Sequence, residues 1–216
     1  MNFYTICFIL VTMSDLLDEQ PFSLTVNGRP YATVMMLPNF LKEFAYGYLL
    51  SENIAKPADI DSVMVDENTI SVLTKNPLKV LTPKKTVISG CGGTASYLDP
   101  EKLPKVSAVA KIPAIQVDFS HPATKAGGFG CALLTEAGEG AKVFDLGQMT
   151  ALDKLFGIAV LKKYALDTCA VAVSGKVTAD MVRKCLFAGV SQIRAGFAPT
   201  KLSDAVAKES GMKIEW

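Results

Sequence analysis

The sequence predicts an α/β protein, with a small α+β region at the N-terminal end and a mostly parallel α/β layer at the C-terminal end. Two pairs of strand-like stretches, one around Asn27-Gly28 and one around residues 66–68, flank a helix-like stretch and predict the first part. Helix-like and strand-like stretches alternate from residue 150 onward, which is typical of right-handed crossovers between parallel strands. We predict two units, residues 14–85 and residues 86–216.

The N-terminal unit is predicted from local patterns. Apolar and polar residues alternate on both sides of Asn27-Gly28, a pair that tolerates the positive φ angles of a tight hairpin turn. Residues 40–51 carry apolar side chains at helical spacing, with Asn39 as a candidate N-cap. Residues 60–65 and 69–73 alternate again and predict a second hairpin.

The C-terminal unit starts with a further predicted hairpin, residues 129–135 and 141–144. A helix is expected over residues 150–164, because Thr150 followed by Asp153 resembles a capping box. The later elements are two strands, at 168–173 and 191–195, two helices, at 178–188 and 202–210, which end at Gly189 and Gly211, and a last strand at 212–216. The all-apolar run 168–173 indicates a strand that is buried on both faces.

The segments before this unit are less regular. Residues 85–89 are expected to form a short strand, and the proline-punctuated residues 97–120 are expected to form a connecting region.

Charge and cysteine content exclude several classes of protein. The chain has 216 residues with 22 basic and 21 acidic side chains, so its charge gives no case for nucleic acid or a membrane as main partner. Five widely spaced cysteines and a single histidine, His121, predict neither a disulfide framework nor the usual zinc site. This pattern fits a reducing cytoplasm.

The first thirteen residues are strongly apolar but lack the basic start of a signal peptide, and they are too short to span a bilayer. We expect either a buried first strand or a true start at Met13.

Cys91 lies among three glycines in Ser89-Gly-Cys-Gly-Gly-Thr94. Glycines let the backbone fold tightly and expose its N–H groups, which lowers the pKa of a thiol and accommodates a bound sulfur species. Two interpretations stay open: Cys91 is a nucleophilic or sulfur-carrying residue, or it is a small residue that fills a turn. Cys131, Cys169 and Cys185 occupy apolar positions and are predicted to be core residues.

Two further loops follow predicted strands and precede predicted helices. Ser174-Gly175-Lys176 offers a lysine beside a helix N-terminus, a combination that favours a phosphate group, although an ordinary turn with an exposed lysine explains it equally. Pro199 and Thr200 end the second loop, and Thr200 could simply cap the helix that follows. For His121 we expect a structural role.

Taken in order, the motifs of this chain resemble those of one family, the FdhD-type formate dehydrogenase accessory sulfurtransferases. The resemblance covers most of the chain from residue 19. It rests on Glu19-Gln-Pro-Phe22, Val26-Asn-Gly28, Glu43-Phe-Ala-Tyr-Gly-Tyr-Leu-Leu-Ser-Glu52, Ser89-Gly-Cys-Gly92, Ala126-Gly-Gly128, Asp145-Leu-Gly147, Ala151-Leu-Asp-Lys-Leu-Phe-Gly157, Ser174-Gly-Lys176, Met181-Val-x-Lys184, Ala188-Gly189 and Ala198-Pro-Thr200.

The resemblance implies a cytidine-deaminase-like three-layer α/β domain without zinc. It also implies that Cys91 receives sulfur as a persulfide from a cysteine desulfurase and passes it to a molybdenum or tungsten cofactor, molybdopterin guanine dinucleotide, for formate dehydrogenase. The residues expected to bind this cofactor are Gly128, Ser174, Gly175, Lys176, Pro199 and Thr200. A homodimer is a possible assembly.

The chain departs from the family pattern in several places. Thr94 stands in place of the second loop cysteine, Gly130 and Met149 stand in place of two histidines, and Gln148 stands in place of an arginine. The sequence also stops at Trp216, where the family continues into a basic tail. These departures leave an alternative open, a non-catalytic chaperone that binds the molybdopterin cofactor or a nucleotide. A zinc-dependent deaminase is excluded, because neither H-x-E nor P-C-x-x-C occurs.

Overall fold

The computed structural model describes residues 17–77 and 100–216. The predicted strand at 85–89, the Cys91 loop and the apolar first thirteen residues lie outside these ranges. A four-stranded sheet in the order β2-β1-β4-β3 forms the N-terminal part, from β1 (Gln20–Val26), β2 (Arg29–Met36), β3 (Ile60–Asp66) and β4 (Thr69–Thr74). Both predicted hairpins are confirmed, and β1 and β4 pair in parallel between them.

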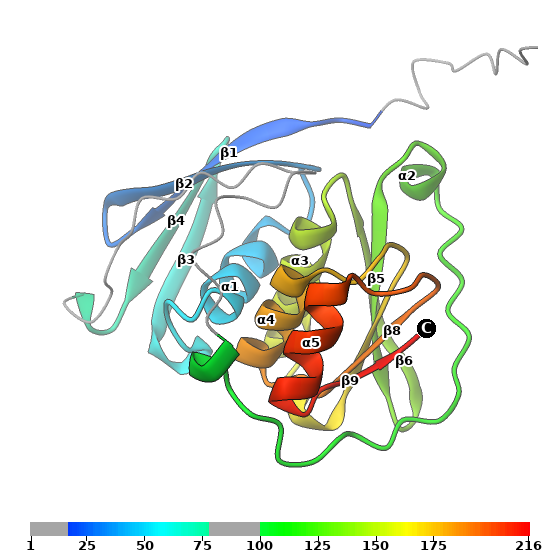
Figure 1. Cartoon of the computed structure of the whole chain (residues 1–216). Helices are drawn as coiled ribbons and strands as arrows, with labels where there is room; N and C mark the ends of the chain where they lie inside the picture. Colours follow the sequence, from blue (N-terminus) through cyan, green and yellow to red (C-terminus); the bar gives the residue numbers. More distant parts are fainter. Residues whose placement is uncertain (1–16, 78–99) are drawn as a thin grey trace, which may run out of the picture.

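Helix α1 (Leu41–Ser51) lies against one face of this sheet, as Figure 1 shows. Its N-cap is Phe40, in the left-handed region with φ 51°, and it makes no side-chain capping bond. The predicted Asn39 cap is therefore wrong. The Asn39 side-chain oxygen instead accepts a hydrogen bond from the Lys154 ammonium at 2.8 Å, because that buried cation requires acceptors.

The second sheet has five strands in the order β6-β5-β7-β8-β9. They are β5 (Phe129–Thr135), β6 (Gly138–Asp145), β7 (Ala170–Val173), β8 (Gln192–Ala195) and β9 (Lys213–Glu215). Strands β7, β8 and β9 are parallel, as predicted, whereas β5 runs antiparallel to both β6 and β7. The sheet is therefore mixed.

Helices α4 (Ala179–Ala188) and α5 (Lys201–Ser210) connect the parallel strands. The Thr178 hydroxyl accepts from the Met181 amide at the start of α4, and Gly189, with φ 88°, ends the helix. Thr200 and Gly211 do the same for α5. The predicted boundaries of both helices are confirmed within one residue at each end.

Helix α3 (Gln148–Leu161) begins two residues earlier than predicted, and its N-cap is Gly147. The predicted capping box of Thr150 and Asp153 is wrong. The Thr150 hydroxyl instead bonds to the Asp145 carboxylate at 3.0 Å, and that same carboxylate accepts from the Leu146 amide at 2.6 Å. The Asp145 carboxylate therefore holds the turn that leads into α3, and the helix itself begins without a side-chain cap.

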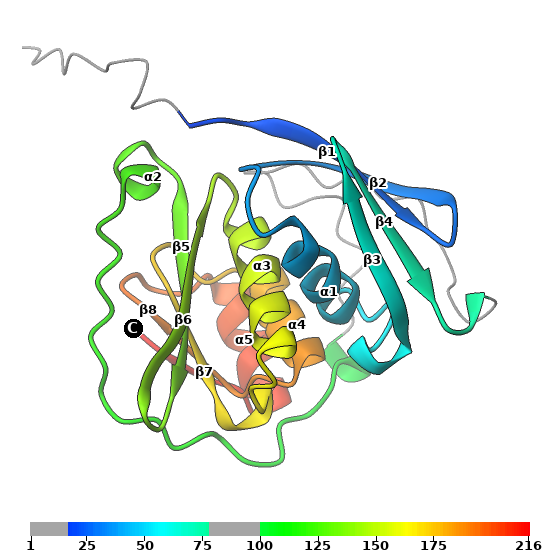
Figure 2. The same ribbon diagram turned by 180° about the vertical axis from the view of Figure 1, so that it is seen from behind.

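The two faces of the five-stranded sheet are covered differently. Alternate strand residues such as Cys131, Leu133 and Val171 share one core with α3, α4 and α5, so these three helices cover one face. The predicted connecting region runs between the short helices Pro100–Lys102 and α2 (Pro122–Lys125), and its apolar residues between 112 and 119 cover the opposite face. Figure 2 shows this extended segment passing around the sheet to α2. The likeness to cytidine deaminases stays a prediction.

Two glycines bring α1 and α3 into direct backbone contact. A Cβ on Gly47 would lie 1.7 Å from the Asp153 carbonyl oxygen, and a Cβ on Gly157 would lie 1.7 Å from the Glu43 carbonyl oxygen. Helix α1 is therefore packed between the four-stranded sheet and α3. The predicted unit boundary at residue 85 lies outside the described residues and stays a prediction. Among the described helices, none has the length and apolar character needed to cross a membrane.

Candidate functional site

The residues predicted to bind the cofactor gather at one edge of the five-stranded sheet. Because β5 is antiparallel to β7, its first residues lie beside the carboxyl end of β7, and β8 ends at the same edge. The Ser174 amide donates to the Gly130 carbonyl at 2.9 Å, and the Gly130 amide donates to the Ser174 hydroxyl at 2.8 Å. Gly128, the Ser174–Lys176 loop and the Pro199–Thr200 loop therefore belong to one region, which we call the carboxyl edge.

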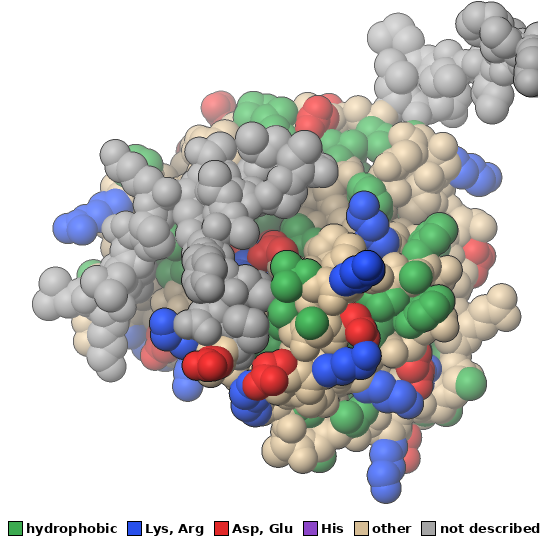
Figure 3. Space-filling model, viewed as in Figure 1, with side chains coloured by type: hydrophobic (Ala, Val, Ile, Leu, Met, Phe, Trp, Pro, Cys, Tyr) green, Lys and Arg blue, Asp and Glu red, His purple; other side chains and the backbone are tan. Residues whose placement is uncertain are grey.

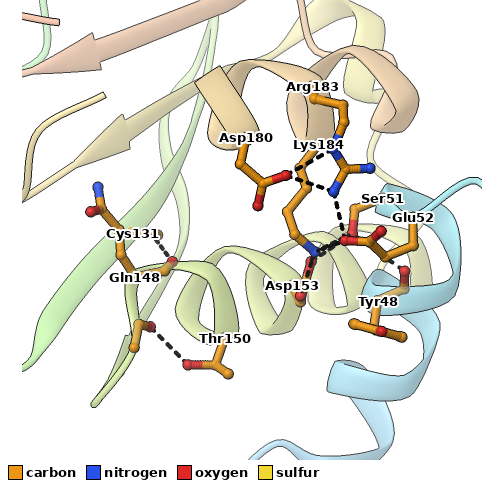
Figure 4. Close-up of polar contacts among 11 residues, drawn as sticks. Tyr48, Ser51, Glu52, Cys131, Gln148, Thr150, Asp153, Asp180, Arg183 and Lys184 are labelled. Atoms are coloured by element: carbon orange, nitrogen blue, oxygen red, sulfur yellow. Dashed lines mark hydrogen bonds and ion pairs between the residues drawn. The ribbon is translucent and has the colours of Figure 1, made fainter. Parts of the chain in front are cut away.

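Gln148, the first residue of α3, contacts the Ser174–Lys176 loop of the carboxyl edge. Its side-chain amide donates to the Lys176 carbonyl at 2.8 Å, and it lies so close to Gly175 that a Cβ there would be 3.0 Å away. Its backbone carbonyl lies beside Cys131 (Figure 4). The Lys176 side chain is exposed at this place. Gln148 thus holds the loop that presents Lys176.

Thr200 caps the helix that follows it, which was one of the two interpretations of this residue. Its hydroxyl accepts from the Ser203 amide at 3.2 Å, which caps α5, and its own amide donates to the Val177 carbonyl at 3.1 Å. The Ser203 hydroxyl donates to the same carbonyl at 3.0 Å. The loop that ends at Thr200 is therefore fastened directly to the loop that contains Lys176.

His121 is held by structural contacts, as predicted. Its Nδ1 accepts from the Ala123 amide at 3.1 Å, and its ring stacks on Phe144 at 4.0 Å. The rings of Phe119 and Phe144 fill the space beside Gly130, where a Cβ would lie 2.6 and 2.9 Å from their atoms. Gly128 is equally confined, since its Cβ would lie 2.7 Å from the Asp145 carbonyl oxygen. Both glycines are required by close packing.

The three described cysteines are buried, as predicted: Cys131, Cys169 and Cys185. Burial raises the pKa of each thiol, and nearby carboxylates raise it further for Cys131 and Cys185. The thiolate is the nucleophile in sulfur chemistry, so these three cysteines are unsuited to it. Cys91 and Cys7 lie outside the described residues.

A buried ionic cluster joins α1, α3 and α4 (Figure 4). The Lys184 ammonium contacts the Asp153 carboxylate at 2.9 Å, the Ser51 hydroxyl at 3.1 Å and Glu52 at 2.9 Å. Ser51 donates to Asp153 at 2.6 Å. Arg183 extends the cluster, because its guanidinium pairs with Glu52 at 2.7 Å.

The two central carboxylates of this cluster have opposite pKa shifts. Burial raises the pKa of Asp153 to about 6, and its contacts with Lys184 and Ser51 offset burial only in part. Burial also acts on Glu52, but the charges of Lys184 and Arg183 outweigh it and lower the pKa of Glu52 to about 2. The Lys184 ammonium also lies over the Tyr48 ring, 5.1 Å from its centroid.

A second buried ion pair anchors the turn before α1. The Lys154 ammonium pairs with the Asp145 carboxylate, and both side chains are fully buried. Lys154 also donates to the Leu37 carbonyl and to the Asn39 side chain, each at 2.8 Å. The acid at the carboxyl edge is thereby connected to the N-terminal sheet. No cluster of three or more potential metal-ligating side chains occurs within residues 17–77 and 100–216.

Comparison with known protein families gives a match over most of this architecture. The model of the FdhD/NarQ family matches residues 17–214, which include both sheets and the carboxyl edge. The chain belongs to the FdhD/NarQ family.

Curated relatives of this FdhD/NarQ chain agree with the assignment. It is 27% identical over 199 residues to "Protein FdhD" of Methanocaldococcus jannaschii, which covers 91% of this chain and 81% of that protein. It is 29% identical over 228 residues to "Sulfur carrier protein FdhD" of Bordetella petrii, with 94% and 81% covered. A solved structure from Desulfotalea psychrophila, described as a formate dehydrogenase accessory protein, has a TM-score of 0.71 and 25% identity, and covers 91% of this chain and 81% of that one.

Several residues of the motifs shared with the FdhD/NarQ family prove to be members of the buried ion pairs. They are Glu52, Asp145, Asp153, Lys154 and Lys184. We did not predict these contacts from the sequence. The available signal was the occurrence of charged residues within otherwise apolar helical stretches, which indicates burial with a partner but does not identify that partner.

Proposed function

We propose that this chain is a sulfur carrier for formate dehydrogenase and that Cys91 carries the sulfur as a persulfide. Elimination among the cysteines supports the choice of residue. Cys131, Cys169 and Cys185 are buried thiols with raised pKa values, and Cys7 precedes the region that the family model matches. Cys91 remains, in a loop of three glycines. The names of the relatives, sulfur carrier protein FdhD, support the role.

The transfer to Cys91 is a thiolate exchange. The Cys91 thiolate attacks the outer sulfur of a persulfide on a cysteine desulfurase, the S–S bond of the donor breaks, and the donor cysteine leaves as a thiolate. One thiol on the acceptor suffices, so Thr94 in place of a second cysteine does not prevent this step. The cytoplasm, where thiols stay reduced, is the compartment that suits it.

The cargo, a molybdopterin guanine dinucleotide with molybdenum or tungsten, is proposed to bind at the carboxyl edge. Lys176 is exposed there beside the N-terminus of α4, and the N-terminus of α5 is fastened to the same loop. Helix N-termini and a lysine together favour phosphate groups. Gly128 and Gly175 belong to the same edge, where each lets a neighbour pack closely, and Pro199 borders it. The hydroxyls of Ser174 and Thr200 hold the loops in place.

The persulfide is tested by incubation with a cysteine desulfurase and cysteine, followed by intact mass measurement. We expect an adduct of one sulfur atom that reduction removes. The adduct should be absent in Cys91→Ala and retained in Cys7→Ala, the matched control. An adduct that persists in Cys91→Ala, or none in the unmodified chain, contradicts the proposal.

A second arm of the same experiment measures binding of guanosine diphosphate and of the isolated cofactor by calorimetry. Lys176→Ala should weaken binding about tenfold or more, as expected for the loss of one charge-assisted contact, whereas the exposed Lys208→Ala should not change it. Binding without any persulfide would instead favour the non-catalytic chaperone.

A further inference from the structure

Three large apolar side chains lie exposed at one corner of the carboxyl edge. Phe197 is 61% exposed in the loop between β8 and α5, Leu202 is 57% exposed in the first turn of α5, and Trp216 is 73% exposed directly after β9. Parallel pairing of Arg194 with Glu215 places Trp216 next to the end of β8. Figures 1 and 2 both show the C-terminus beside the β8–α5 loop. Single exposed apolar residues are ordinary, but a cluster of this kind marks an interaction surface.

The loop that presents Phe197 is held at its base. Two hydrogen bonds, from the Thr200 amide and the Ser203 hydroxyl, converge on the Val177 carbonyl, and Thr200 caps α5. A side chain that is displayed from such a fixed base loses little conformational entropy when a partner covers it. The cluster therefore has the properties of a preformed docking surface.

The charge around this corner is positive. Lys201, the first residue of α5, is exposed, and neither it nor Lys176 forms an ion pair with any described residue. The nearby acids already have partners, since Asp204 pairs with Lys208, and Glu215 pairs with Arg194 and Lys213. Figure 3 shows apolar and basic side chains side by side over this part of the molecule.

We propose that Phe197, Leu202, Trp216 and Lys201 form the docking corner for the client enzyme, through a surface of that enzyme that combines an apolar depression with acidic residues. The proposal rests on the proposed function, because the client must approach the edge where the cargo lies. A second copy of this chain fits less well. A two-fold contact would place the unpaired lysines of both copies against each other and would cover the carboxyl edge.

The test measures binding of the full chain to formate dehydrogenase lacking its cofactor. The double variant Phe197→Ser with Leu202→Ser should weaken binding at least tenfold, because exposed aromatic and aliphatic anchors dominate such contacts. The matched control is Met64→Ser with Leu73→Ser, which changes two side chains of comparable exposure, 65% and 48%, on the other sheet. Lys201→Glu should slow association, and the effect should decrease at high salt.

Persulfide loading of Cys91 is measured on the same variants, so that failure of this proposal is separable from failure of the proposed function. Normal loading with weakened client binding only in the corner variants supports the docking corner. Unchanged client binding, or equal weakening in the control, overturns it. A corner variant that alters the sedimentation of the chain alone, with client binding intact, assigns the surface to a second copy and also overturns it.

Discussion

At the scale of single residues, the Lys184 ammonium is a buried charge that depends on its partners. The side chain is 2% exposed, and its charge is balanced by carboxylates from two other helical segments. Removing a buried ion from water is costly, and the cost is recovered only when good partners are in place. The pair therefore contributes little net stability as a whole, but the loss of one member leaves the other buried without compensation.

We predict that Lys184→Met lowers the free energy of unfolding by about 3–5 kcal/mol, because Asp153 then remains buried without its cation and Glu52 keeps only Arg183. Urea denaturation followed by circular dichroism measures this change. The matched control is Lys208→Met, which removes an exposed pair with Asp204 and should cost no more than about 0.5 kcal/mol. If both variants lowered the free energy of unfolding equally, the buried cluster would contribute no more to stability than the exposed pair does.

Asp153 makes stability depend on pH. Its folded-state pKa of about 6 lies above the ordinary value of 3.8, so the folded chain binds this proton more tightly than the unfolded chain does. The resulting stabilisation is complete below the ordinary pKa and is lost as pH rises through about 6. The difference in unfolding free energy between the unmodified chain and Asp153→Asn should therefore fall by about 1–3 kcal/mol between about pH 4.5 and pH 7. Glu52, whose pKa is lowered to about 2, loses its contribution only below this range. If the difference in unfolding free energy between the two chains did not change with pH, the raised pKa of Asp153 would be contradicted.

At the scale of elements, the crossing of α1 over α3 depends on two glycines. The backbones touch at Gly47 and Gly157, so neither position has room for a methyl group. We predict that Gly47→Ala lowers the free energy of unfolding by about 3 kcal/mol or more, since the two helices must separate and the buried ion pairs stretch. Thermal and urea unfolding measure the loss.

Gly196→Ala is the matched control for this substitution. The glycine is exposed, and a Cβ there would meet nothing within 4 Å. We expect its unfolding free energy to stay within about 0.5 kcal/mol of the unmodified chain. If Gly47→Ala and Gly196→Ala lowered the free energy of unfolding equally, the close crossing of α1 and α3 would not be the cause of the loss.

The helix caps show which part of the fold could be predicted from the sequence. The cap at Thr200 could be predicted, because a hydroxyl that bonds to an amide three residues on is a local interaction. Asn39 and Thr150 are residue types that also cap helices, but their predicted capping roles are wrong. Their hydrogen bonds go to Lys154 and Asp145, which local spacing could not identify.

At the scale of the whole molecule, the candidate site also has a part that local sequence patterns predict and a part that depends on distant residues. The loops of the carboxyl edge could be predicted, because strands followed by helices bring their carboxyl ends to a common edge. The ionic cluster could not, because it joins residues far apart in the chain. Ser51 and Asp153 are separated by 102 residues, and Ser51 and Lys184 by 133. A pattern read over a few turns of helix has no information about such partners.

That separation has a consequence for how the protein is made. Ser51, the last residue of α1, leaves the ribosome 102 residues before Asp153, its partner in α3. At a synthesis rate of about 5–20 residues per second, the N-terminal sheet and α1 wait about 5–20 s for their partner. During that interval Ser51, Glu52 and the bare backbone at Gly47 face the solvent. Because these groups are polar or lack a side chain, they expose less apolar surface than an apolar face of the same size would. The waiting segment is therefore less prone to associate with other nascent chains.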